Sequence, residues 1–161
     1  MPLVVKGFSK QNIISPAQIE TAIIHLPKHH ISSLECIAFD PSRFYQRSYA
    51  DPRPINYAAA GEYSRLPINH ILIFNFRSQN EFLHILYHEI GHHVFKHVLD
   101  SFQRKSWVMD VSRNGEYVTE YAKTNASEDF AECYSIYLSD RERLAPIQLK
   151  YKFIENLMFN E

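Results

Sequence analysis

The stretch from Ser78 to Leu99 constrains the fold of this chain more than any other part of the sequence. It opens with Ser78 and Glu81 at the spacing of a capping box, in which two side chains bond free N–H groups at the start of a helix. Apolar side chains then point around most of the helix circumference: Phe82, Leu83, Ile85, Leu86, Tyr87, Ile90, Val94, Phe95 and Val98. A helix that is apolar on most sides is expected to lie inside the molecule. Histidines within it therefore need partners in the folded chain.

This helix carries His88, Glu89 and His92 in the order His-Glu-Ile-Gly-His. Residues four positions apart lie one turn apart on nearly the same face, so both imidazoles can bind one metal ion while Glu89 projects beside them. Zn²⁺ held in this way leaves room for water and lowers the pKa of that water toward about 7, and Glu89 can accept the proton. The pattern indicates a zinc hydrolase, although the nine histidines of the chain also allow it to arise by chance.

The other histidines of the helix are not expected to bind the same ion. His93 and His97 are turned well away from His88, and we expect them to be core or surface residues. His84 shares the face of His88, but it lies about 12 Å along the helix axis from His92. That separation is too large for all three imidazoles to bind one ion.

The third ligand is predicted to be a glutamate on a later helix. Phe95 and Val98 stand where a metzincin has glycine and its third histidine, so that class is excluded. Glu128 and Glu132 share one face of a predicted helix, so Glu128 can bind the ion while Glu132 accepts a hydrogen bond from a ligand histidine. The alternative is that both are solvated helix carboxylates. Their place after the His-Glu pattern favours metal binding, and the predicted cofactor is Zn²⁺.

The rest of the sequence predicts one α+β domain over residues 1–161. No repeat or glycine-rich linker divides the chain, and its length suffices for a single core. A helix is predicted from a capping box at Ser15 to Pro27, and strands are predicted over 34–39 and 68–75, the second apolar enough to be covered on both faces. Further segments are predicted as follows: an irregular connection after Pro41, a polar and aromatic connection over 101–123, a helix from Asn125 or Ser127 to about Leu138, and a last helix, interrupted or started by Pro146, that runs through Leu157. A helix and strands followed by helices are typical of the α+β class.

Charge and composition exclude several kinds of partner. The chain has 17 basic and 18 acidic side chains and a net charge of −1, so it offers no basic field for nucleic acid or an anionic membrane. No apolar run approaches the roughly 20 residues of a membrane span, and the N-terminus lacks the pattern of a signal peptide. We therefore expect a cytoplasmic protein, or one exported without a cleavable signal. Cys36 and Cys133 are predicted to be small core residues, with a single disulfide as the alternative.

The two site motifs resemble those of the gluzincin proteases. The segments are HEIGH at 88–92 and TEYAKTNASEDFAE at 119–132, and they are similar to the catalytic domain of anthrax toxin lethal factor and to the pro-pro endopeptidases. The resemblance covers mainly 68–138 and implies a zincin-like metalloprotease domain, with a small mixed sheet packed on the His-Glu helix and a helical C-terminal part. It also implies that Tyr121, seven residues before the ligand glutamate, donates its hydroxyl to the developing oxyanion, the alternative being a core aromatic. In such folds the strand before the helix pairs with an extended substrate, which would be the strand 68–75 unless it is central.

The sequence therefore predicts a zinc-dependent endopeptidase that acts as a monomer on a protein or peptide substrate. Neither nucleic acid nor a membrane is an expected partner, and the segments 43–65 and 103–115 are expected to be loops that set subsite depth. One alternative is a regulatory zincin resembling the ImmA/IrrE proteins, which acts inside the cell on a repressor partner. Another is a non-catalytic module that holds zinc. An intact Glu89 and only three protein ligands argue against the module, because structural zinc sites usually have four.

Overall fold

Four short strands form a mixed sheet in the computed structural model, which describes residues 2–42 and 60–160. They are β1 Val4–Lys6, β2 Cys36–Phe39, β3 Gly61–Ser64 and β4 His70–Ile73, and their order in the sheet is β1-β2-β4-β3. β1, β2 and β4 are parallel, whereas β3 pairs antiparallel with β4, with Gly61 opposite Ile73. The mixed α+β organisation predicted from the sequence is confirmed.

The strand predicted over 68–75 is central and offers no free edge to a substrate. β4 bonds to β2 on one side and to β3 on the other. The prediction that this strand pairs with a substrate is therefore wrong, and the alternative of an interior strand is confirmed. Its apolar run suits this place, because side chains on both of its faces can be covered. The two edge strands among the described residues are β1 and β3, and β3 lies in a segment that the sequence predicts as a loop.

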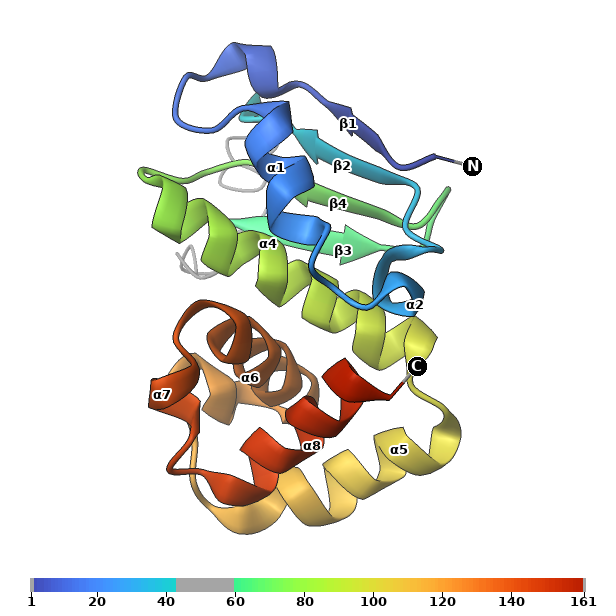
Figure 1. The fold of residues 1–161 in the computed structure, drawn as a ribbon, viewed down its shortest axis with the longest axis vertical. Coiled ribbons are helices and arrows are strands. Elements are labelled where there is room, and N and C mark those ends of the chain that lie inside the picture. The colour runs from blue at the N-terminus through green and yellow to red at the C-terminus, as the bar shows by residue number, and fades with distance from the viewer. Residues whose placement is uncertain (1, 43–59, 161) are drawn as a thin grey trace, which may run out of the picture.

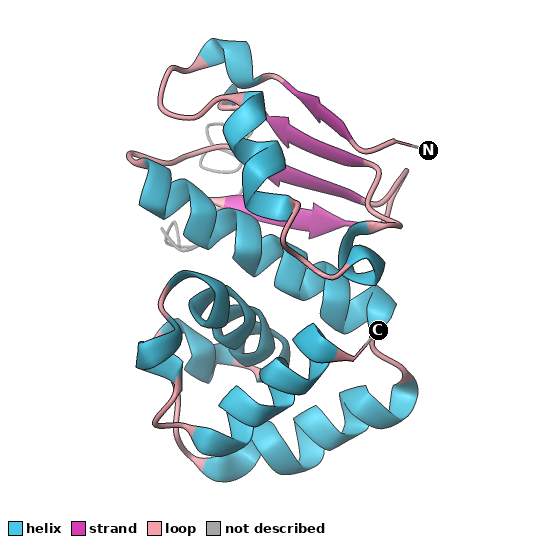
Figure 2. Ribbon diagram, viewed as in Figure 1, coloured by secondary structure: helices cyan, strands magenta, loops and turns pink. Residues whose placement is uncertain are grey.

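The helices divide around the sheet as Figures 1 and 2 show, with α1 lying across one face of the sheet and α4 running between the sheet and the C-terminal helices. Their bounds are α1 Pro16–Ile23, α2 Lys28–Ile31, α4 Gln79–His93, α5 Ser101–Ser106, α6 Ala126–Ser139, α7 Arg141–Leu144 and α8 Gln148–Phe159. Short 3-10 segments are η1 Phe8–Lys10, η4 Ser112–Asn114 and η5 Tyr121–Thr124, and π-helical segments are η2 Val94–Val98 and η3 Trp107–Val111.

The predicted helix starts are confirmed by the capping contacts. The Ser15 side chain accepts from the Gln18 N–H in a full capping box, and α1 begins at the next residue. The Asn125 side chain caps α6, which resolves the choice between Asn125 and Ser127. The Ser78 side chain accepts from the Glu81 N–H at 3.1 Å, but the Glu81 carboxylate bonds the N–H of Arg77 at 3.1 Å instead of closing the box.

Several predicted boundaries differ from the structure. The first helix ends at Ile23 before Pro27, and Pro27 precedes the short helix α2. The segment predicted as a connection over 101–123 begins with α5 and η3, because Asp100 and Gln103 form a capping box. The loop expected over 103–115 is therefore largely helical. The irregular connection predicted after Pro41 lies mostly in 43–59, outside the described residues.

Helices α4 and α6 pack against each other at their closest point through Gly91. A Cβ atom added at Gly91 would lie 2.9 Å from the Cα atom of Ala131 and 3.3 Å from its carbonyl oxygen. Only a residue without a side chain allows the two backbones to approach this closely. The contact holds α6 against the face of α4 that carries Gly91 and His88.

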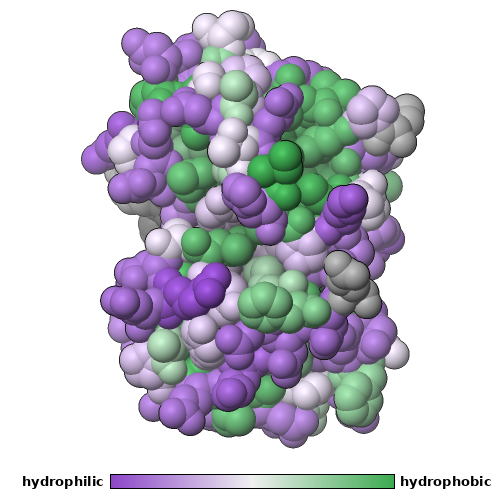
Figure 3. Space-filling view, in the orientation of Figure 1, coloured by the Kyte–Doolittle hydropathy of each residue, from purple (hydrophilic) through white to green (hydrophobic). Residues whose placement is uncertain are grey.

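The two cysteines are buried and free, as predicted, so they form no disulfide between them. Within 2–42 and 60–160, no helix is both long enough and apolar enough to cross a bilayer. Figure 3 shows apolar surface gathered over the sheet half beside α1, whereas the helical half presents a mostly polar surface in this view.

Candidate metal centre

Three predicted ligands meet at one point between α4 and α6. The Nε2 atoms of His88 and His92 each lie 3.0 Å from Oε2 of Glu128. The three ligand atoms are all within 4.8 Å of one another, and both histidines are buried. Among the residues that the structure describes, this is the group of histidine and acidic side chains that can hold a metal ion.

The ring nitrogens that face away from this point have their own partners. Nδ1 of His88 lies 2.7 Å from Oε1 of Glu132 and donates its hydrogen to that carboxylate. Nδ1 of His92 lies 3.1 Å from Oγ of Ser127, which can accept its hydrogen. When each Nδ1 carries the hydrogen, each Nε2 has a lone pair directed to the meeting point. Each histidine can thus keep the hydrogen on Nδ1 while Nε2 binds a metal.

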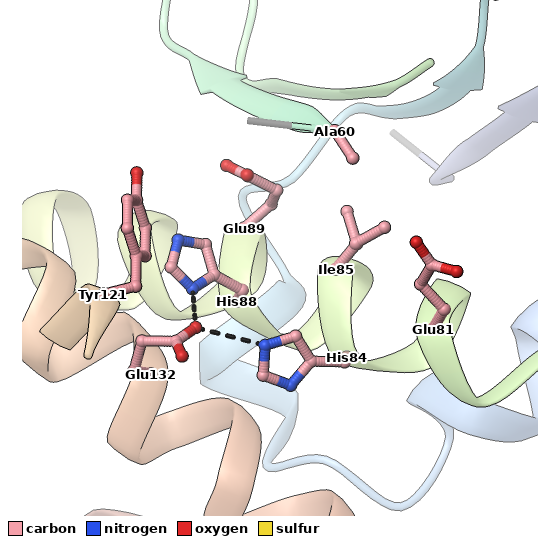
Figure 4. A pocket seen from close by; sticks show the side chains of 8 residues that line it. All are labelled: Ala60, Glu81, His84, Ile85, His88, Glu89, Tyr121 and Glu132. Carbon is pink, nitrogen blue, oxygen red and sulfur yellow. Dashed lines mark hydrogen bonds and ion pairs between the residues drawn. The ribbon is translucent and has the colours of Figure 1, made fainter. Parts of the chain in front are cut away.

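Glu132 is the centre of a hydrogen-bond network, as Figure 4 shows for two of its contacts. Besides His88, its Oε1 accepts from Nε2 of His84 at 3.2 Å, and its Oε2 accepts from the hydroxyl of Thr119 at 2.7 Å. Three donors fix the orientation of the carboxylate. The hydrogen bond that Glu132 accepts from His88 agrees with the role that the sequence predicts for this residue.

The charges at the centre stabilise one another. Burial lowers the pKa of His88, but hydrogen bonds to Glu128 and Glu132 outweigh it and raise the pKa to about 10. Burial raises the pKa values of both glutamates, but their bonds to histidines dominate and hold them well below the usual range. Both carboxylates are therefore ionised at neutral pH. A metal bound to Nε2 of His88 takes the place of a proton, so binding releases that proton.

Glu89 lies beside the ligands without a hydrogen bond or ion pair to them. Its side chain is buried, with 5% of the residue exposed, and it lines the cavity on the sheet side of the centre. Burial raises its pKa, although His88 and His92 partly offset the effect. Gly61 of β3 approaches this side chain closely, since a Cβ atom at Gly61 would lie 3.3 Å from Cγ of Glu89. A carboxylate with a raised pKa next to a metal site can accept a proton at neutral pH.

Tyr121 also lies at the centre, at the start of η5. Its ring centroid is 5.8 Å from that of His88, and its side chain lines both cavities next to the site. Burial, followed by the charge of Glu128, raises the pKa of its phenol. The hydroxyl therefore stays protonated and can donate a hydrogen bond. The alternative of a tyrosine packed wholly inside the core is wrong, because this residue is only partly buried and faces the cavities.

The remaining helix histidines have other partners. His93 is fully buried and contacts the hydroxyls of Tyr63 at 3.0 Å and Ser33 at 3.2 Å, while His97 is exposed and stacks on the His93 ring. Neither belongs to the metal group, as predicted. His84 is likewise not a ligand, but it bonds Glu132, a contact that the sequence analysis does not predict.

Ser127 and Thr119 are also not predicted, although the sequence contains a signal for each. Ser127 directly precedes the ligand glutamate, and Thr119 stands two residues before Tyr121. Both are hydroxyl residues within the second site motif. Their partners depend on how η5 and α6 pack on α4, which a linear pattern does not specify.

Two cavities flank the centre and share His88, Glu89 and Tyr121. The larger cavity has a volume of about 480 Å³ and extends along β3. Its other lining residues are Gly61, Glu62, Tyr63, His92, Lys96, Asn125, Ser127 and Glu128. The smaller has a volume of about 150 Å³ and extends toward the N-terminus of α4. The metal-binding group is thus open to a ligand from both sides.

The donor set fits a zinc ion. A tetrahedral Zn²⁺ with bonds of about 2.0–2.1 Å separates its ligand atoms by about 3.3–3.4 Å, close to the 3.0 Å between Glu128 and each imidazole. Two imidazoles and one carboxylate are also the ligands of catalytic zinc sites that keep one open position. No protein-family model, curated protein or solved structure matches this chain.

Proposed function

We propose that this chain is a zinc-dependent endopeptidase of the gluzincin type, with a zincin-like fold, that hydrolyses peptide bonds in a protein substrate. The main support is the position of Glu89 beside the meeting point of His88, His92 and Glu128. A metal group with an adjacent buried carboxylate and a flanking cleft has the parts that metal-assisted hydrolysis requires. The similarity of both motifs to the lethal factor and pro-pro endopeptidase families supports the same activity.

The protein residues have distinct proposed roles. Zinc, when bound by His88, His92 and Glu128, supplies a Lewis acid that polarises a carbonyl group and lowers the pKa of water. Glu89 accepts a proton from water and passes it to the leaving amine, and its raised pKa favours holding that proton between the two steps. The protonated Tyr121 hydroxyl donates to the oxyanion.

The substrate is proposed to bind as an extended strand along β3. This strand is one of the two sheet edges among the described strands, and it is the edge that lines the larger cavity, through Gly61, Glu62 and Tyr63. Backbone groups at a sheet edge can bond an added strand. An extended peptide bound there would pass directly over Glu89.

Metal analysis followed by peptide-library cleavage tests this function. The purified protein should contain one zinc ion per chain and cleave peptides, and chelation should abolish cleavage. Glu89→Gln should retain zinc and lose about 10²–10⁴-fold in rate, which is the usual contribution of a general base. Glu142→Gln is a matched control, because it removes one carboxylate from the exposed surface of α7.

Three results would argue against the proposal. A Glu89→Gln protein that cleaves as fast as the parent would exclude Glu89 as the base. Bound zinc without cleavage of any peptide would favour the non-catalytic zinc module. Cleavage confined to one repressor-like protein would favour the ImmA/IrrE-like alternative.

A further inference from the structure

The smaller cavity has an apolar body and an acidic outer end. We call it the Glu81 pocket, and its lining residues are Ala60, Glu81, His84, Ile85, His88, Glu89, Tyr121 and Glu132. Figure 4 shows Glu81, Ile85 and Glu89 on one face of α4, at successive turns, with Ala60 opposite them. Ile85 and Ala60 are buried and form apolar walls. An apolar cavity of about 150 Å³ holds a group the size of benzene, so this pocket can take one side chain.

Glu81 is the carboxylate of this pocket that remains open to a ligand. Glu132 already accepts hydrogen bonds from His84, His88 and Thr119, and Glu89 is buried at the inner end. Glu81 is exposed, and its Oε2 accepts a hydrogen bond from the backbone N–H of Arg77 at 3.1 Å. No lysine or arginine lines the pocket among the described residues. The outer end therefore carries a negative charge without a basic partner in the lining.

The larger cavity differs in charge from the Glu81 end, because a bound zinc ion would offset the charge of its ligand Glu128. Its described lining contains the carboxylates of Glu62, Glu89 and Glu128 and a single lysine, Lys96. Lys96 follows the metal-binding residues on the C-terminal side of α4, whereas Glu81 precedes them in the first turn. A cationic group that enters the cleft is thus favoured at the Glu81 end and opposed at the Lys96 end.

On the basis of the proposed function, we infer that the Glu81 pocket binds a lysine or arginine side chain of the substrate close to the scissile bond. The aliphatic stem packs on Ile85 and Ala60, and the cationic end reaches the Glu81 carboxylate. The pocket shares His88, Glu89 and Tyr121 with the metal centre, so its occupant must lie near the bond that is cleaved. Glu81 is accordingly a specificity residue for the proposed reaction.

Paired peptides measure the charge preference directly. A library first locates cleavage sites, and two peptides are then made that differ only by lysine or norleucine at each position flanking the site. At one position, kcat/KM for the lysine peptide should exceed that for the norleucine peptide by about three- to tenfold, as expected for a partly exposed ion pair. Glu81→Gln keeps the acceptor for the Arg77 N–H and should remove the preference for lysine. Glu81→Lys should shift the preference toward a peptide with glutamate at that position. Glu142→Gln should leave it unchanged.

Equal rates for the two peptides at every flanking position would overturn the inference, as would a lysine preference that persists in Glu81→Gln. If the protein cleaves no peptide, the proposed function fails, and the pocket is tested by binding of labelled peptides that carry either lysine or norleucine at one position to the zinc-loaded protein. Tighter binding of the lysine peptide, lost in Glu81→Gln, would then support the pocket without the hydrolase. Equal binding of the two peptides would reject both the pocket and the hydrolase.

Discussion

The buried ion pair between Lys150 and Asp129 provides a sharp test of how α8 is held on α6. Both residues are 0% exposed, and Nζ of Lys150 lies 2.9 Å from Oδ2 and 3.1 Å from Oδ1 of Asp129. The same ammonium donates to the carbonyl of Glu116 and lies 4.1 Å from the ring centroid of Tyr117. Lys150→Met keeps an unbranched side chain and removes the charge.

The expected cost of Lys150→Met is about 3–5 kcal/mol in the free energy of unfolding, as for other buried pairs that lose one partner. The Asp129 carboxylate would keep Ser112, 2.7 Å away, and the weak donor Cys133, 3.6 Å away. Burial raises the pKa of Asp129 despite these contacts, so the charge is costly without the lysine. Such a loss is a large part of the 5–15 kcal/mol that stabilises an ordinary domain.

Urea denaturation followed by tryptophan fluorescence is the appropriate assay. Trp107 is the single tryptophan, and its ring centroid lies 5.1 Å from Phe130 of α6 and 5.1 Å from Phe153 of α8. Its emission therefore reports on the packing that the ion pair holds together. Lys152→Met is the control, because Lys152 is exposed on the same helix and should change stability by no more than about 0.5 kcal/mol.

A double-mutant cycle separates the pair from the general effect of each substitution. Asp129→Asn combined with Lys150→Met should be less destabilised than the two single losses predict together, by at least about 2 kcal/mol. Additive losses, or a cost below about 1 kcal/mol for Lys150→Met alone, would refute the reasoning.

Three further predictions concern the metal centre and its surroundings. Glu132→Gln should weaken zinc binding by about 10–100-fold in a chelator competition, since it removes the charged acceptor of His88, and an unchanged affinity would contradict this role. Gly91→Ala should lower stability by about 1–3 kcal/mol, because the cost of the clash with the Ala131 backbone exceeds the roughly 1 kcal/mol gain in helix propensity. An unchanged melting temperature would show that α6 can move to relieve the clash. Burial lowers the pKa of His30 from 6.5 to about 4, so stability that is present above pH 6.5 is lost on acidification as the unfolded chain takes up the proton. The free energy of unfolding of the parent minus that of His30→Phe should therefore fall by about 2 kcal/mol from pH 7 to pH 5 in urea denaturation. A constant difference would argue against a neutral His30.

The parts of the site that could be predicted from sequence are those coded by local spacing. Ser78 and Asn125 mark helix starts, and His88 and His92 share a helix face wherever that helix packs. Glu132 is one turn from Glu128 for the same reason. The coarse α+β class also follows from the order of such local patterns.

The missed features depend on contacts between distant segments. β3 has four residues and no clear apolar alternation, and it is ordered by pairing with β4 and by the approach of Gly61 to α4. Lys150 would be assigned to the surface by its residue type, and only the tertiary fold supplies Asp129. The Asp100 capping box is different, because its Asp-x-x-Gln spacing is a local signal in the sequence for the start of α5, within the segment 101–123 that is predicted as a connection.

The proposed ligands come from two helices, and 36 residues separate His92 from Glu128 in the sequence. An ion bound by both would act as a reversible cross-link that closes this long loop. Its contribution to folding would grow with supply, reaching about 2.7 kcal/mol when free metal exceeds the dissociation constant a hundredfold. Resistance of the chain to degradation would then follow the availability of the ion, and metal scarcity would shorten the lifetime of the protein.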